Sequence, residues 1–378
     1  MDHAENGLCH QGLVGRLADL RITTLLTQSP EPGGLLIAPS FVGVCGTDLQ
    51  IVNGMRPDTA HVLGHEGGGV VVEAGRGAAL RPGQKVVFNP SAQLPKGRIL
   101  GHNFDGLFQR YIAVDAQAVT DGLTQPAQDG LPAICAALVE PLAGIIYTHE
   151  LISHAVPDLE SVVVFGAGPV GLLMTEYLRQ TGTRVLLVHP GQARLNTAVE
   201  LQFITASATM TLADNLPERM LDWNGAQYFD AAVICTSMAG AVAALGHAVK
   251  VLKNGGCIEM VSNYALSSPT PEGISAQALR TVRAANICGN PPEGAYITAE
   301  VGGRRIVFTS HRGTSWAHLS RAMEALSSST SRYSALITHI LTLQDAAKAI
   351  RTLAGERGAL VEGRDCIKAV VDMARSAQ

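Results

Sequence analysis

A glycine-rich turn between an apolar strand and a helix constrains this chain more than any other feature of its sequence. Residues 162–171 read VVVFGAGPVG, a G-x-G-x-x-G pattern directly after a strand-like run. The first glycine permits a tight turn, the second lets the backbone approach a pyrophosphate, and the third lets the helix pack closely on the strand. Because a second apolar strand ends near residue 188, we predict a dinucleotide site rather than an ordinary strand-to-helix turn. The residues assigned to this site are Gly166, Gly168, Pro169, Val170 and Gly171.

The end of that second strand bears on the choice between NAD and NADP. A carboxylate about 20 residues after the turn normally holds the ribose hydroxyls of NAD, but residues 188–194 read VHPGQAR and contain none. An acidic residue would repel the 2′-phosphate of NADP, whereas His189 and Arg194 would not. The sequence therefore favours NADP(H) over NAD(H). The alternative is that His189 fills a surface turn and that NAD binds without the carboxylate.

Apolar strands alternate with helices after residue 155, which predicts a parallel, doubly wound α/β sheet. The expected strands are residues 161–165, 184–188, 231–235, 257–261 and 306–309, with helices near 170–180, 193–201 and 239–252. The stretch 264–303 is rich in Pro and Gly. It either shapes the substrate or nicotinamide side of the site or forms an elaborated loop around a helix at 276–284.

Short β segments cut by Gly and Pro dominate the first 154 residues, which predicts a β-rich, partly barrelled domain. They are expected at residues 20–26, 35–43, 69–74, 85–88 and 110–114. Residues 1–18 show no clear pattern and are interpreted as a loosely held tail. From residue 311 the chain is expected to return to this domain, with helices at 316–326 and 343–353 and a final strand at 367–371.

Composition excludes several classes of function. The 378 residues carry a net charge of −4 and only 4% aromatic residues, without a basic stripe, so no nucleic-acid partner is expected. No apolar run was expected to reach the ~18 residues that span a membrane. The first five residues, MDHAE, are acidic where a signal peptide is basic, which favours the cytoplasm. Seven cysteines without a CxxC pair argue against a disulfide framework.

Three separated segments upstream of the turn carry competent metal ligands. They contain Cys45 in GVCGTD, His65 in GHE and Glu140 in EPLA. A thiolate, an imidazole and a carboxylate suit zinc better than magnesium or calcium, and a catalytic site needs about three such ligands and one open position. The separate alternatives are a core thiol, a turn histidine and a glutamate that favours a helix N-terminus.

Together with the glycine-rich turn, these segments resemble the zinc-dependent medium-chain dehydrogenases/reductases, and in particular the branch of sorbitol and threonine dehydrogenases. The resemblance runs in order along nearly the whole chain. The matching segments are residues 30–33 (PEPG), 43–48 (GVCGTD), 64–66 (GHE), 83–86 (GQKV), 105–111 (DGLFQRY) and 140–142 (EPL). The resemblance implies a GroES-like catalytic domain formed by residues 1–154 and 311–378, and a Rossmann cofactor domain formed by residues 155–310.

The resemblance also implies roles for individual residues. One catalytic zinc per chain is expected on Cys45, His65, Glu66 and Glu140, and which of the two glutamates binds stays open. Asp48 resembles the carboxylate that orients the ligand histidine. Thr47 resembles the hydroxyl that passes the substrate proton outward, so Thr47, Cys45, His65 and Glu66 form the expected catalytic group.

The chain departs from the family pattern in two places. Gln50 stands where many members carry a histidine that ends the proton relay, and an amide takes no proton near neutral pH. Residues 89–98 hold no cysteine, so a structural zinc is not expected. His102 lies in this shortened loop and is interpreted as a residue without a catalytic role.

These features predict a zinc-dependent enzyme that transfers hydride reversibly between a secondary alcohol and NAD(P). The alcohol is expected to be a polyol, an amino alcohol or a cyclitol, and the family resemblance implies a homodimer or homotetramer. Two alternatives stay open. One is a zinc-free NADPH reductase of activated double bonds or carbonyls, against which Cys45, His65 and Glu66 count. The other is a non-catalytic nucleotide-binding sensor, which Gln50 leaves open.

Overall fold

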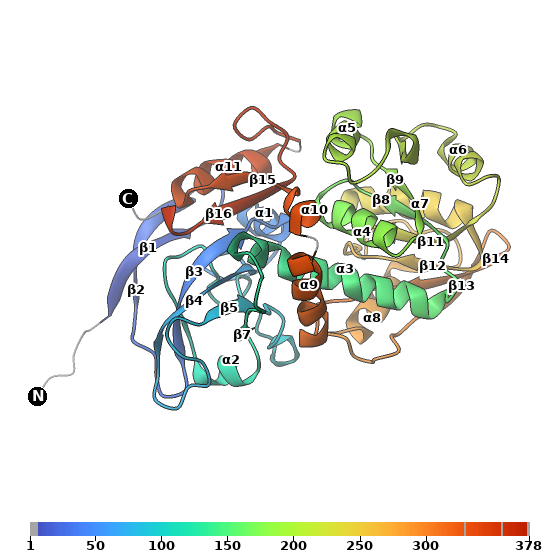
Figure 1. The fold of residues 1–378 in the computed structure, drawn as a ribbon. Coiled ribbons are helices and arrows are strands. Elements are labelled where there is room, and N and C mark those ends of the chain that lie inside the picture. Colours follow the sequence, from blue (N-terminus) through green and yellow to red (C-terminus); the bar gives the residue numbers. More distant parts are fainter. Residues whose placement is uncertain (1–6, 329, 357, 376–378) are drawn as a thin grey trace, which may run out of the picture. The chain divides into compact units, whose positions relative to one another are not determined.

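The computed structural model describes residues 7–328, 330–356 and 358–375. Contacts within the chain divide it into two compact units. Figure 1 labels the elements of both and colours the chain along its sequence. Unit 1 comprises residues 1–141 and 315–378, and unit 2 comprises residues 142–314. Each unit is built around its own sheet, so the fold of each follows from its own strands.

Unit 1 is the β-rich part of the chain. Its strands are β1 (Leu8–Val14), β2 (Arg21–Thr27), β3 (Leu35–Gly43), β4 (Glu66–Ala74), β5 (Lys85–Phe88), β6 (Ile112–Val114), β7 (Thr124–Pro126), β15 (Ile337–Leu341) and β16 (Lys368–Asp372). Its helices are α1 (Gly46–Val52), α2 (Ala116–Thr120), α9 (Trp316–Ser328), α10 (Thr330–Ser334) and α11 (Leu343–Gly355). The main sheet has the order β15-β16-β3-β4-β5-β7, and β6 also pairs with β3.

Strand β3 is the hub of this sheet because it pairs antiparallel with β4, β6 and β16. Leu35, Ile37 and Val42 on β3 are buried in the core of unit 1. The C-terminal strands β15 and β16 are parallel to each other and join the sheet beside β3. The last part of the chain thus completes a sheet that begins near residue 35.

The N-terminal segment differs from the prediction of a loosely held tail. Residues 8–14 form β1, which pairs antiparallel with β2 over its whole length. Leu13 and Val14 are buried in the core of unit 1, and Leu13 donates its backbone N–H to the carbonyl of Phe108. The prediction is therefore wrong for residues 8–14, whereas residues 1–6, which include the acidic MDHAE segment, lie outside the described residues.

Unit 2 alternates strands and helices. Its strands are β8 (Ser161–Phe165), β9 (Arg184–Val188), β10 (Thr209–Met210), β11 (Phe229–Ile234), β12 (Leu252–Glu259), β13 (Ile297–Val301) and β14 (Arg304–Thr309). Its helices are α4 (Pro169–Gln180), α5 (Gln192–Glu200), α6 (Leu216–Trp223), α7 (Met238–Val251) and α8 (Ala276–Ala285). The chain enters this unit within helix α3 (Ala136–Ala155).

The sheet of unit 2 has the order β10-β9-β8-β11-β12-β14-β13, parallel except for β13. From β8 the chain first builds outward to β9 and β10, and then returns to build β11, β12 and β14 on the other side. The strand order therefore reverses between β8 and β11. Ligands of such sheets bind at the carboxyl ends of the strands beside this reversal, which is where the glycine-rich turn follows β8.

The stretch 264–303 contributes regular structure to this unit. Helix α8 falls where a helix was expected, and its Leu279 and Val282 are buried. Strand β13 was not predicted, and it pairs antiparallel with β14 at the edge of the sheet. Glycines at 302 and 303 form the tight turn between these two strands, with φ of 57° and 76°.

Helix α3 requires a second correction. The segment Ala133–Ala155 has a mean hydropathy of 1.3 over its most apolar part, which is long and apolar enough to cross a membrane. The expectation that no segment reaches that length is therefore wrong. Of that apolar part, 72% is buried inside the fold, which is typical of the core helix of a globular protein.

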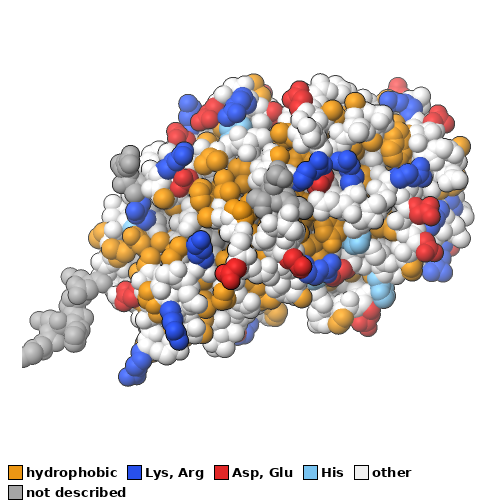
Figure 2. All heavy atoms as spheres, viewed as in Figure 1, with side chains coloured by type: hydrophobic (Ala, Val, Ile, Leu, Met, Phe, Trp, Pro, Cys, Tyr) orange, Lys and Arg blue, Asp and Glu red, His pale blue; other side chains and the backbone are white. Residues whose placement is uncertain are grey.

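Charged side chains of both signs are interspersed on the face of the molecule that Figure 2 draws. Among the described residues of that face, Lys and Arg do not gather into a single patch. This distribution agrees with the small net charge of −4.

The hub role of β3 leads to a stability prediction. Ile37→Ala should lower the free energy of unfolding by about 2–5 kcal/mol, because the removed atoms are fully buried and leave a cavity. Leu26→Ala on β2 is the matched control, since Leu26 is 61% exposed, and should change it by less than about 0.5 kcal/mol. The midpoints of urea unfolding compare the two variants, and equal shifts would contradict the prediction.

Candidate metal and cofactor sites

The strand ends of unit 1 bring the predicted ligands together. Cys45 follows β3 and is the N-cap residue of α1, while His65 directly precedes Glu66, the first residue of β4. In the sheet, Gly43 on β3 lies opposite Glu66 on β4 and opposite Val370 on β16. The antiparallel pairing thus places two ligand segments that are 20 residues apart beside each other.

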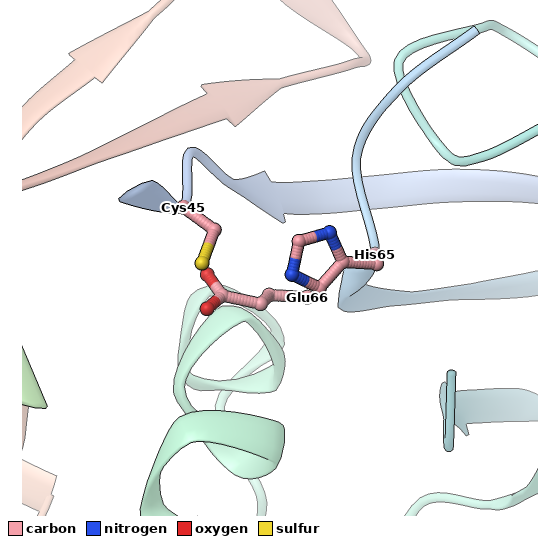
Figure 3. A group of neighbouring side chains, drawn as sticks. All are labelled: Cys45, His65 and Glu66. Atoms are coloured by element: carbon pink, nitrogen blue, oxygen red, sulfur yellow. The ribbon is translucent and has the colours of Figure 1, made fainter. Parts of the chain in front are cut away.

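The side chains of Cys45, His65 and Glu66 form a compact donor cluster. Their potential ligand atoms all lie within 4.8 Å of one another. Figure 3 shows the Cys45 sulfur beside the Glu66 carboxylate, with one ring nitrogen of His65 facing both. His65 and Glu66 are buried and Cys45 is half-buried. Zinc binds sulfur at about 2.3 Å and nitrogen or oxygen at about 2.0–2.2 Å, so donors this close fit one ion.

Asp48 is placed to orient His65, as the family resemblance implied. Its buried carboxylate accepts the N–H of Cys45 at 2.8 Å and that of Gly64 at 3.1 Å. Its Oδ1 lies 3.5 Å from His65 Nδ1, a buried atom that has no hydrogen bond of ordinary geometry. Burial alone would raise the pKa of Asp48, but His65 and these N–H groups hold it below its ordinary value. This placement suits the orienting role that the resemblance implies for Asp48, because its carboxylate faces one ring nitrogen of His65.

Neighbouring charges also shift the pKa values of His65 and Cys45. Burial alone would lower the pKa of His65, but Asp48 and Cys45 outweigh it and raise that pKa well above its ordinary value. Burial and the Glu66 carboxylate raise the pKa of the Cys45 thiol. Because a metal needs the thiolate and the neutral imidazole, zinc binding here would release protons.

Lys368 is a member of this site that sequence reasoning missed. Its ammonium forms an ion pair with Glu66 Oε2 and donates to the carbonyl of Val44 at 3.1 Å. Only 2% of Lys368 is exposed. A Cβ at Gly43 would lie 2.8 Å from both Glu66 Oε2 and Lys368 Cε, so this pair requires glycine there. The signal available in the sequence was a single lysine at the start of the final strand, directly before the apolar residues 369–371.

The two glutamates differ in their surroundings. Glu66 is compensated by Lys368, whereas Glu140 is half-buried on α3. Burial and the Glu66 carboxylate raise the pKa of Glu140 to about 7. Within the described residues, Glu140 is not part of the cluster whose ligand atoms lie within 4.8 Å. Its carboxyl group is nonetheless close enough for the charges of that cluster to change its pKa.

Two further residues lie beside the cluster. Thr47 is half-buried on α1 and donates its backbone N–H to Cys45 Sγ at 3.4 Å. His102, for which no catalytic role is predicted, packs edge-on against His65, with ring centroids 5.0 Å apart. Its Nδ1 lies 3.2 Å from Asp58 Oδ1. Burial, His65 and Arg56 lower the pKa of His102 to about 3, so it is neutral at physiological pH.

The glycine-rich turn of unit 2 has the shape of a phosphate-binding turn. Gly166 has φ of +110°, and a Cβ there would lie 2.6 Å from the carbonyl oxygen of Cys235. A Cβ at Gly171 would lie 1.8 Å from the Gly166 carbonyl, whereas one at Gly168 would meet nothing within 4 Å. Helix α4 begins after Gly168 without a side-chain cap, so its first N–H groups remain available to an anion.

The residues assigned to the ribose end lie beyond β9. His189 follows the strand, and its Nδ1 accepts the N–H of Gly191 at 3.0 Å. Arg194 is half-buried on α5. The segment from His189 to Arg194 holds no carboxylate. The segment after β9 therefore carries a histidine and an arginine but no acidic side chain.

Comparisons with known proteins identify the family. A family model of the alcohol dehydrogenase GroES-like domain matches residues 31–123. L-galactonate-5-dehydrogenase of Escherichia coli K12 is 30% identical over 264 residues, which cover 62% of this chain and 71% of the relative. The chain belongs to the medium-chain dehydrogenase/reductase family.

Other members of this dehydrogenase/reductase family agree with that conclusion. Sorbitol dehydrogenase of Halalkalibacterium halodurans is 29% identical over 261 residues, covering 62% of this chain and 71% of the relative. The structure of 2R,3R-butanediol dehydrogenase from Bacillus subtilis superposes with a TM-score of 0.71 at 21% identity, covering 96% of this chain and 99% of that chain. The predicted family and the predicted combination of a GroES-like domain with a parallel Rossmann sheet are confirmed. The chain is an oxidoreductase of the alcohol dehydrogenase type.

The buried ion pair behind the cluster leads to a second prediction. Lys368→Met should destabilise the protein by about 3–5 kcal/mol, because Glu66 would keep a buried charge without its partner. The double variant Glu66→Gln with Lys368→Met removes both charges and should recover most of that loss. Lys348→Met, an exposed lysine on α11, is the control. Urea unfolding of the four proteins measures the effect, and a double variant that loses as much as Lys368→Met would contradict it.

Proposed function

We propose that this enzyme is a zinc-dependent alcohol dehydrogenase that holds one catalytic zinc on Cys45, His65 and a glutamate. The observation that carries the proposal is the buried donor cluster of Cys45, His65 and Glu66. Its thiol, imidazole and carboxylate are the donor set that zinc prefers, and the buried Nδ1 of His65 faces Asp48. When bound, the zinc would polarise a substrate oxygen and lower the pKa of an alcohol.

Residues of the chain would orient the metal ligands and transfer the substrate proton. Asp48 keeps His65 in the tautomer that points its other nitrogen at the metal position. Lys368 neutralises Glu66 and so limits its availability as a ligand, which leaves Glu140 as the alternative carboxylate. With its pKa raised to about 7, Glu140 also holds a proton in much of the metal-free protein near neutral pH. Thr47, beside Cys45 on α1, is assigned to pass the hydroxyl proton of the substrate outward.

Unit 2 would supply the hydride acceptor. The turn at Gly166, Gly168 and Gly171, together with Pro169 and Val170 at the start of α4, binds the cofactor pyrophosphate. When bound, the nicotinamide would accept the hydride of the alcohol carbon in the oxidative direction while the hydroxyl proton leaves to solvent, which would give a ketone and a reduced cofactor. We assign unit 1 as the catalytic domain and unit 2 as the cofactor domain. The predicted limits are residues 154 and 310, whereas the two units divide at residues 141 and 314.

The substrate class rests on the relatives. They are named as dehydrogenases of L-galactonate, butanediol, sorbitol and L-threonine, compounds in which the carbinol carbon has oxygen or nitrogen on a neighbouring carbon. A polyol, an amino alcohol or a cyclitol is therefore the substrate that we propose. By the same resemblance, we propose a cytoplasmic homodimer or homotetramer.

NADP(H) is the cofactor that we favour. The absence of a carboxylate between His189 and Arg194 supports it, because the 2′-phosphate would meet basic rather than acidic side chains. A protein of the same fold from Sinorhizobium meliloti 1021, 20% identical with a TM-score of 0.73, was solved with bound NADP.

The zinc proposal predicts the result of elemental analysis. Protein purified without added metal should contain about one zinc per chain, and Cys45→Ala should lose both the zinc and turnover with polyols, because the thiolate is removed. Cys9→Ala, an exposed cysteine on β1, is the matched control and should keep both. Full zinc and turnover in Cys45→Ala would refute the site. Wild-type protein that lacks zinc and does not take it up would favour the metal-free reductase or the sensor.

The cofactor proposal predicts the outcome of a titration with both reduced cofactors. NADPH should bind at least about tenfold more tightly than NADH, and Arg194→Glu should reverse this order by repelling the 2′-phosphate. Arg184→Glu is the control, because Arg184 is an exposed residue at the opposite end of β9. Quenching of intrinsic fluorescence gives the dissociation constants. Tighter binding of NADH by the wild type would overturn the preference.

A further inference from the structure

A buried acid–histidine pair lies at the sheet edge of unit 2, apart from the residues discussed so far. Glu259 is the last residue of β12, and His311 follows the end of β14 by two residues. These strands are parallel neighbours, with Glu259 opposite Thr309. Because the glycine-rich turn also follows the carboxyl end of its strand, β8, the pair and the turn lie along the same edge of one sheet.

The pair has the geometry of an oriented histidine. His311 Nδ1 lies 2.8 Å from Glu259 Oε1, and Glu259 is fully buried. A carboxylate only accepts hydrogen bonds, so the proton of this bond sits on Nδ1. The second oxygen, Oε2, is buried without a partner in the described chain. An incompletely satisfied buried carboxylate is costly, which argues against a purely structural purpose.

The other side of the imidazole lies beside α3, and His311 is 7% exposed. A Cβ built on Gly144 of α3 would meet only one atom within 4 Å, His311 Nε2 at 3.9 Å. The ring of Tyr147, one turn further along α3, packs against the imidazole with centroids 4.6 Å apart and so holds its plane. Because Nδ1 is bonded to Glu259, Nε2 is the ring nitrogen left for a ligand, and no side chain of α3 fills the space beside it at Gly144.

The order of the strands indicates which half of a dinucleotide would lie near His311. The turn after β8 takes the pyrophosphate, and the residues that select the adenosine ribose follow β9 on one side of it. The other half of a dinucleotide must then extend over β11, β12 and β14. With strands about 4.8 Å apart, β12 lies roughly 10 Å from β8, which is within the span of one nucleoside.

We propose that His311, oriented by Glu259, binds the nicotinamide half of the cofactor through Nε2. In the neutral tautomer with its proton on Nδ1, Nε2 accepts a hydrogen bond, so its partner is a donor, either the amide N–H of the carboxamide or a hydroxyl of the adjoining ribose. Glu259 acts as a positioning residue that keeps Nε2 turned toward the cofactor. The inference rests on the proposed nicotinamide cofactor of the same unit.

Binding to the whole cofactor and to its adenosine half separates this role from a structural one. His311→Ala should raise the dissociation constant of NADPH about tenfold, the effect of one lost hydrogen bond at a buried site, and leave that of 2′,5′-ADP unchanged. His311→Gln, whose amide oxygen accepts a hydrogen bond, should restore part of the affinity. Glu259→Gln should weaken the binding of NADPH but not that of 2′,5′-ADP, and by a smaller factor than His311→Ala. His247→Ala, a histidine on α7, is the matched control.

Other results would contradict the role of His311 or show which group of the cofactor it contacts. An unchanged affinity for NADPH in His311→Ala, or an equal loss for NADPH and 2′,5′-ADP, would overturn the role of His311. Wild-type protein that binds neither ligand would instead contradict the proposed cofactor. The 3-acetylpyridine analogue of NADPH lacks the amide N–H. If His311→Ala no longer weakens binding of that analogue, the contact is to the carboxamide, and a persistent effect assigns it to the ribose.

Discussion

The ion pair between Glu66 and Lys368 links β4, early in the chain, to β16, the last strand of unit 1. It lies at the donor cluster that we propose as the zinc site. It is buried among β3, β4 and β16, and both charges depend on each other because neither reaches water. Gly43 has no side chain because the pair occupies that space. The position of Cys45 follows from this arrangement, since it comes two residues after Gly43 and begins α1 with its own backbone held by Asp48.

Much of this architecture was predictable, because local patterns carry it. Residues 35–43 and 85–88 are strands at the predicted bounds, and the turn at 166–171 joins a strand to a helix as its glycines require. The grouping of Cys45, His65 and Glu66 was also expected, as part of the ligand set that the family resemblance implied. The comparisons confirm the family, and the ligand roles of these residues stay a proposal.

The features that the sequence did not reveal depend on distant partners. Residues 8–14 lack a strong pattern and become a strand through pairing with β2. Helix α3 was missed because Glu140 and Pro141 interrupt its apolar character, yet proline is accommodated inside the helix. Lys368 meets Glu66 across 302 positions of sequence, and Glu259 meets His311 across 52. No local periodicity reports such pairs, because burial turns them into partners only after the sheets have formed.

The location of Lys368 also has a consequence for how the protein is made. The donor cluster is encoded between residues 45 and 66, but the charge that balances it is encoded near the C-terminus. During synthesis, a nascent chain that has already exposed residues 35–74 still lacks β16, which completes the sheet beside β3. Its Glu66 has to stay hydrated until the last strand emerges. The donor cluster of unit 1 is therefore among the final parts of the molecule to mature, although its residues are among the first to be translated.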